Sequence, residues 1–203
     1  EGEELGMTNA HFTKLEQYRD LEALNGYRQR VEEAKCQSSE SMMAALALIG
    51  RDNARTPMQW DASKYAGFTA PDAPVEPWIS VNPNHVEINA AEEFDDPDSV
   101  YTFYKKLIAM RHNSATISTG EWHLLAADSD QVYAFTRTNG DDTILVVVNL
   151  TDRSAALPSD VAELLSDGVN ESQVLLSTYD AMHSVKSIAR GELARWEGVV
   201  IQL

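Results

Sequence analysis

Residues 51–60 bring together side chains that could bind a hydroxyl-rich ligand. The run reads Arg-Asp-Asn-Ala-Arg-Thr-Pro-Met-Gln-Trp, which holds two guanidinium groups, a carboxylate, an amide and an indole. Guanidinium groups and carboxylates make directional hydrogen bonds to paired sugar hydroxyls, while an indole covers the apolar face of a pyranose ring. Pro57 disfavours helical geometry at Thr56, so we expect a shaped loop. The alternative is an arginine-rich surface loop held by local ion pairs.

Other candidates for chemistry are few. The five histidines are scattered, with no pair at metal-ligand spacing, so we expect no metal site and no cofactor. Cys36 is the only cysteine, which excludes an intrachain disulfide and fits a reducing, cytoplasmic location. Adjacent acids occur at 32–33, 92–93 and 95–96, where a solvated helix surface or a helix start explains them.

Composition limits the classes of partner. The 203 residues carry a formal net charge of -16, which disfavours binding to nucleic acid or to an anionic membrane. No apolar run reaches the roughly 18 residues that a membrane-spanning helix needs. The chain opens on Glu1, with no initiator methionine and no signal-peptide pattern, so we expect a fragment of a longer protein.

The elements that must position residues 51–60 are predicted to be helical before this loop and irregular after it. Apolar residues at three- and four-residue spacing predict a helix within residues 15–34 and another at 38–49, ended by Gly50. Residues 61–89 are rich in proline and form a long irregular segment, a kind of loop that is usually functional. A further helix begins near residue 98 and ends at 111–113.

After residue 117 the hydrophobic pattern changes from helical to alternating. Runs at 122–126, 132–138, 144–149, 174–178 and 199–203 are typical of strands, and Asn139-Gly140 predicts a hairpin turn. We therefore expect one domain over 1–116 and an antiparallel β domain over 117–203.

Six segments carry a resemblance to a known family: residues 1–9, 51–60, 66–69, 77–84, 87–89 and 104–108. In this order they resemble the C-terminal part of the α-amylase superfamily of glycoside hydrolases, in particular its α-glucosidase and oligo-1,6-glucosidase branch. The resemblance implies an α+β chain: residues 1–116 would be the end of strand eight, the active-site loop and the eighth helix of a (β/α)8 barrel, and 117–203 an all-β antiparallel sandwich. The upstream part of the same barrel would be the partner of this chain.

The resemblance also implies a reaction. Family members hydrolyse α-glucosidic bonds with retention, using an aspartate nucleophile, a glutamate acid/base and a second aspartate that stabilises the transition state. These acids come from strands upstream of Glu1, so we expect no catalytic residue in this chain.

Substrate positioning is the role that remains for these residues. Arg51 matches the family arginine that hydrogen-bonds the glucose on the nonreducing side of the cleaved bond, unless it is tied to Asp52 or a helix end. Glu22 matches a glutamate that reaches the neighbouring acceptor-side sugar. We expect Asp52 and Arg55 to brace Arg51 through ion pairs. Trp60 either stacks on sugar or packs in the core of the loop.

The expected function is therefore that of the C-terminal part of a retaining α-glucosidase, inactive alone, acting in the complete enzyme on terminal α-1,4 or α-1,6 bonds of short oligosaccharides. Trehalose-6-phosphate hydrolase and sucrose isomerase are alternative enzymes. A non-catalytic amylase-like scaffold would have no need for the polar groups of residues 51–60. A carbohydrate-binding module would need an exposed aromatic row, and the sequence does not place Trp122, Tyr133, Phe135 and Trp196 on one face.

Overall fold

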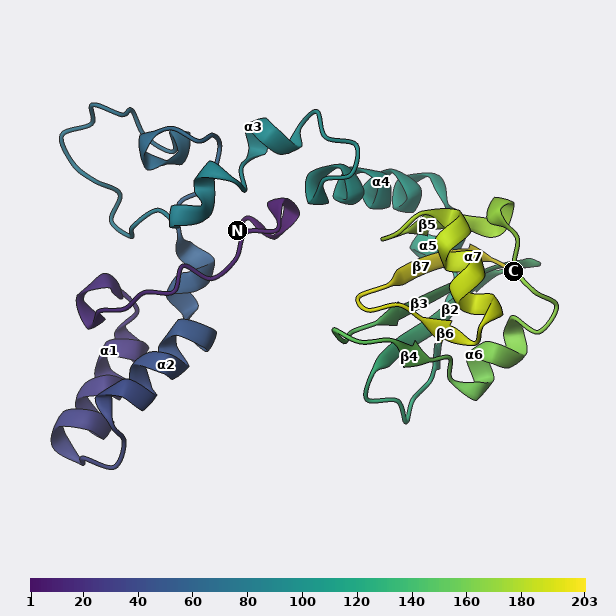
Figure 1. Ribbon diagram of the computed structural model, residues 1–203, viewed down its shortest axis with the longest axis horizontal. Coiled ribbons are helices and arrows are strands. Elements are labelled where there is room, and N and C mark those ends of the chain that lie inside the picture. The colour runs from purple at the N-terminus through teal and green to yellow at the C-terminus, as the bar shows by residue number, and fades with distance from the viewer. The chain divides into compact units, whose positions relative to one another are not determined.

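The computed structural model describes all 203 residues, which form two compact units, Glu1–Lys105 and Lys106–Leu203 (Figure 1). The first unit is helical and irregular, and every strand belongs to the second. None of the helices combines the length and the apolar composition that crossing a membrane requires.

The first unit is built from short helices joined by extended loops, as the proline-rich composition of residues 61–89 predicts. In order they are η1 (Glu3–Leu5), η2 (Leu15–Gln17), α1 (Leu21–Tyr27), η3 (Arg28–Glu33), α2 (Ser39–Ile49), η4 (Arg51–Arg55), η5 (Lys64–Gly67), η6 (Pro83–Val86) and α3 (Ala90–Glu93), and α4 (Val100–Asn113) leads into the second unit.

Helices α1 and α2 form an antiparallel pair directly before η4. The Asp20 side chain caps α1 by accepting a hydrogen bond from the amide of Ala23, and α2 ends at Gly50. Ala23 of α1 packs in one buried cluster with Met42 and Leu46 of α2. The predicted helix at 38–49 is confirmed. The one predicted within 15–34 is confirmed from residue 21 to 33, with a 3-10 turn and an extended link before it.

The second unit is an antiparallel sheet with strand order β1-β2-β3-β7-β5, plus a two-strand pair, β4 and β6. The five predicted strands and the hairpin between β2 and β3 are confirmed, and Gly140 adopts the positive φ of 62° that this turn requires. The elements are α5 (Ala115–Thr119), β1 (Glu121–Leu125), β2 (Val132–Asn139), β3 (Asp142–Asn149), β4 (Ala155–Ala156), α6 (Ser159–Leu164), η7 (Glu171–Gln173), β5 (Val174–Ser177), α7 (Ala181–Ala189), β6 (Glu192–Leu193) and β7 (Gly198–Gln202).

One face of this sheet carries the core. Leu145 and Ile201 lie in a buried cluster with Val161 of α6 and Ile188 of α7, so the layer over the sheet is partly helical (Figure 1). The sequence pattern does not predict α6 or α7. Both are short, and the apolar stripe of α7, formed by Ala181, Val185 and Ile188, is only two turns long and is interrupted by the buried polar residues Ser184 and Ser187.

A buried carboxylate ties α7 to the start of β7. Glu197 has no exposed surface, and its oxygens accept hydrogen bonds from Ser184 Oγ at 2.7 Å and from the amide of Ala194 at 2.6 Å. His183 Nε2 lies 3.9 Å from Glu197 Oε2, and the His183 ring stacks on Tyr179. A buried charge is tolerated only when it is hydrogen-bonded, and these partners meet that requirement.

Candidate functional site

Asp52 anchors the loop that follows α2. Its side chain is fully buried, and Oδ2 accepts hydrogen bonds from the backbone amides of Arg19 at 2.6 Å and Asp20 at 2.8 Å. Oδ1 lies 3.2 Å from Arg55 Nη1 in an ion pair. The carboxylate therefore joins η4 to the segment that starts α1.

Arg55 connects two carboxylates through one nitrogen. Its Nη1 lies 3.0 Å from Asp20 Oδ1 as well as near Asp52. The hydrogen bond from the amide of Ala23 lowers the pKa of Asp20 below its usual value, and the hydrogen bond from Arg55 lowers it further. The same contact with Asp20 raises the pKa of Arg55.

Arg51 is the arginine of this loop that has no hydrogen-bonded partner, although its charge also lowers the pKa of Asp20. Its side chain is exposed and forms no hydrogen bond or ion pair, because the neighbouring Asp52 is directed to Arg55 instead. Arg51 lines a cleft of about 520 Å³ and also a second cleft of about 340 Å³ that includes Asn9 and Asn53. A guanidinium with all donors available at the wall of a cleft is suited to bind a polar ligand.

Glu22 lines the same 520 Å³ cleft as Arg51. The two residues are distant in sequence and are brought together because α2 returns antiparallel to α1. Asp20 and Glu22 are the two carboxylates of this cleft, and Asp20 is already bound by Arg55 and Ala23. The cleft can therefore bind and orient a ligand, but it holds no second free carboxylate to pair with Glu22 in acid/base chemistry.

Trp60 lies apart from both clefts that Arg51 lines. Its side chain is 52% exposed, while its backbone pairs with Ala66 and Ala91. The buried residue at this point of the loop is Gln59, whose Nε2 donates to the carbonyl of Ile88.

Two polar residues that the sequence did not single out, Asp20 and Asn53, also hold the loop in place. Asp20 caps α1 and holds Arg55, and a helix-capping acid just before Leu21 is the sequence signal that could have identified it. Asn53 donates from Nδ2 to the carbonyls of Leu46 and Ala47 at the end of α2. Nothing in the sequence pattern singles out Asn53, because its partners depend on where α2 ends.

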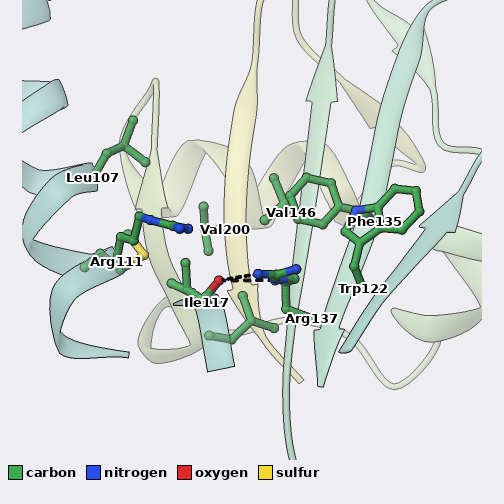
Figure 2. Close-up of a pocket in the computed structure, with 10 residues that line it drawn as sticks. Leu107, Arg111, Ile117, Trp122, Phe135, Arg137, Val146 and Val200 are labelled. Carbon is green, nitrogen blue, oxygen red and sulfur yellow. Dashed lines mark hydrogen bonds between the residues drawn. The ribbon is translucent and has the colours of Figure 1, made fainter. Parts of the chain in front are cut away.

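The second unit has an apolar pocket of about 320 Å³ on the sheet face opposite its core (Figure 2). Trp122 of β1 and Phe135 of β2 lie 6.4 Å apart between ring centroids, and Tyr133 lies 5.6 Å from Phe135. Arg137 is already satisfied, since Nε and Nη2 both donate to the carbonyl of Ile117. Three of the four aromatics that the sequence could not place thus share one face.

Comparison with known proteins shows the family to which this chain belongs. Residues 1–120 match the family model described as "Alpha amylase, catalytic domain", and residues 122–166 match "Maltogenic Amylase, C-terminal domain". Because the first match spans more than half of the 203 residues, the chain belongs to the α-amylase family.

Its relatives are glycoside hydrolases. The chain is 39% identical over its whole length to an oligo-1,6-glucosidase of Parageobacillus thermoglucosidasius, and 51% identical over 69% of its length to an α-glucosidase of Pediococcus pentosaceus. It spans 34% of the first relative and 24% of the second. Among solved structures it matches a mutant of MutB, a trehalulose synthase, in complex with sucrose, with a TM-score of 0.78 and 37% identity over 99% of this chain and 34% of that one.

Proposed function

We propose that this chain is the C-terminal part of a retaining α-glucosidase that hydrolyses terminal α-1,4 or α-1,6 glucosidic bonds of short oligosaccharides. The observation that carries the proposal is that Arg51 and Glu22, the two residues expected to bind substrate, line one cleft. The α-glucosidase and oligo-1,6-glucosidase relatives support it.

In this proposal Arg51 holds the hydroxyls of the glucose on the nonreducing side of the bond, and Glu22 reaches the acceptor sugar. Both act by orienting the substrate, which lowers the barrier by holding the reacting groups in place. Asp52 and Arg55 keep Arg51 at the cleft wall, and Trp60 has no assigned contact with substrate. The nucleophile and the acid/base are supplied by residues outside these 203.

Replacing Arg51 in the full-length protein tests the proposal. Arg51→Ala should lower kcat/KM for isomaltose and maltose by at least about tenfold, and Arg51→Lys should restore only part, since an ammonium cannot reproduce the guanidinium fork. Arg153→Ala, an exposed arginine of the second unit, is the control. Unchanged turnover and affinity in Arg51→Ala would remove this residue from the site, and glucose release by the 203 residues alone would contradict upstream catalytic acids.

A second candidate reaction is isomerisation of sucrose, favoured by the trehalulose synthase neighbours. It would use the same glucosyl-binding residues and differ in the fate of the glucosyl group, which returns to fructose instead of going to water. Incubating the full-length protein with sucrose separates the two, because an isomerase yields a new disaccharide and a hydrolase yields free glucose.

We further propose that the apolar sheet face of Figure 2 packs against the upstream part of the same barrel and does not bind sugar. Its aromatics are partly exposed, with Trp122 at 48% and Tyr133 at 45%, and such a patch marks an interaction surface. A sugar site also needs free polar groups, and the bonded Arg137 leaves only Arg111 in this pocket.

We also propose that the boundary between the two domains lies between residues 116 and 117. We further propose that the protein is located in the cytoplasm. Cys36, an exposed free thiol, supports a reducing location. The net charge of -16 supports a partner that is neither nucleic acid nor membrane.

A further inference from the structure

The cleft that holds Arg51 and Glu22 continues along one face of the first helical pair. Asn25 of α1 and Gln29 of η3 line it beyond Glu22, at three- and four-residue intervals that place them on the same side of the helix, and Arg30 directly follows Gln29 along the cleft. The opposite wall is apolar and comes from α2, with Met42, Leu46 and Ile49. One wall therefore offers hydrogen-bonding groups and the other offers hydrocarbon.

Arg30 places an unpaired positive charge on the polar wall. Its exposed guanidinium forms no hydrogen bond or ion pair, whereas Arg28, two residues earlier, pairs with Glu33 at 3.6 Å and does not line the cleft. Asn25 accepts a hydrogen bond from Arg28 and keeps its amide donors free. Free donors along a cleft wall are what a ligand rich in hydroxyl groups requires.

The backbone of η3 is π-helical where these side chains project. The amide of Ala34 bonds to the carbonyl of Gln29 at 2.9 Å, a five-residue spacing that widens the turn. Turns of this kind are rare and occur frequently at functional sites. Here the wider turn accompanies two sequence neighbours, Gln29 and Arg30, that both line the cleft.

The polar wall of the cleft is longer than a single sugar ring. At about 1.5 Å per residue along a helix, Arg30 lies roughly 12 Å beyond Glu22. Gly26 lies between them and faces α2, since a Cβ at this position would be in van der Waals contact with Met42 Cε at 3.4 Å. The cleft thus continues past the place where Glu22 would hold the acceptor sugar.

We propose that Asn25, Gln29 and Arg30 bind the third and later sugars of a linear α-glucan oligosaccharide whose first two sugars are held at Arg51 and Glu22. This inference rests on the proposed α-glucosidase function and extends it to chain length. The amide and guanidinium groups donate to sugar hydroxyls, while the exposed Ile49 covers the apolar face of a ring. In the complete enzyme, substrates of three or more sugars should therefore gain binding energy from contacts that a disaccharide does not reach.

Kinetics of the full-length enzyme on isomaltose, isomaltotriose and isomaltotetraose test the inference. Arg30→Ala should lower kcat/KM for the two longer substrates by about tenfold or more, the size expected for one hydrogen bond from a charged donor, mainly through KM. Isomaltose should be unaffected, because it does not reach Arg30. Gln29→Ala should show the same length dependence with a smaller loss.

Lys35→Ala is the matched control, since it removes a positive charge from the same exposed segment but outside the cleft. It should leave all three substrates unchanged. An equal loss on all three substrates with Arg30→Ala, or no loss on the longer ones, would overturn the extended cleft while the α-glucosidase function stands. An enzyme that prefers α-1,4 bonds is tested in the same way with maltose, maltotriose and maltotetraose. A wild-type enzyme that hydrolyses neither series would overturn both.

Discussion

Arg55 Nη1 lies 3.0 Å from Asp20 Oδ1, and this ion pair joins the loop after α2 to the first turn of α1. Arg51 and Glu22 are close neighbours in sequence of these two residues, one on each side of the cleft. The pair therefore helps to fix the separation of the two groups that we propose to bind adjacent sugars.

Removing Arg55 should impair catalysis without removing a substrate contact. Arg55→Ala leaves Asp20 and the buried Asp52 without their cation, so η4 should shift and Arg51 with it. We expect kcat and kcat/KM of the full-length enzyme to fall about tenfold or more, because small misplacements of positioning groups are costly. Arg55→Lys should retain part of the activity. Wild-type kinetics in Arg55→Ala would show that Arg51 keeps its place without the ion pair.

The Asp20 carboxylate should stabilise the chain in a pH-dependent way. Its pKa is lowered from the usual 3.8 in the folded state, first by the Ala23 amide and then by Arg55. Its contribution is therefore complete above the unfolded pKa and is lost as the pH falls through the lower folded value. The melting temperature of wild type should exceed that of Asp20→Asn by a constant amount above about pH 5, and the difference should shrink below about pH 4. A difference that does not change with pH would contradict this assignment.

Among the acidic residues of the second unit, we expect substitution of Glu197 to lower the free energy of unfolding the most. Glu197→Ala leaves the amide of Ala194 without its acceptor and leaves Ser184 Oγ with Ser177 Oγ as its one remaining partner, which should cost about 1–3 kcal/mol of unfolding free energy. Glu197→Gln keeps one acceptor oxygen and should lose less. Denaturant unfolding measures both. Glu163→Ala, on the exposed side of α6, should change stability by less than about 0.5 kcal/mol, and an equal cost at both positions would contradict the network.

The apolar sheet face should contribute more to the thermal stability of the complete protein than to that of this chain alone. Phe135→Ser should lower the melting temperature of the full-length enzyme clearly and that of the 203-residue chain only slightly, because the proposed partner of this face is the rest of the barrel. Titration of the chain with maltose should show no binding. Saturable maltose binding that Trp122→Ala abolishes would instead support a carbohydrate-binding module.

The sequence determined the elements that local pattern encodes. Alternating apolar residues predicted five strands, Asn139-Gly140 predicted their hairpin, and the helix at 38–49 ended at Gly50 as its glycine requires. The ordered motifs around residues 51–60 also identified the family. These features depend on neighbours along the chain, so no tertiary information was needed to find them.

The tertiary structure decided which of the polar residues are free and which are committed. Arg55 forms ion pairs with Asp20 and Asp52. Arg51, Glu22 and Arg30 instead line a common cleft. The helices α6 and α7 and the buried Glu197 likewise depend on the sheet that they cover. The physical reason is the same in each case: burial and hydrogen-bond partners are set by residues far apart in sequence, and only folding brings those residues together.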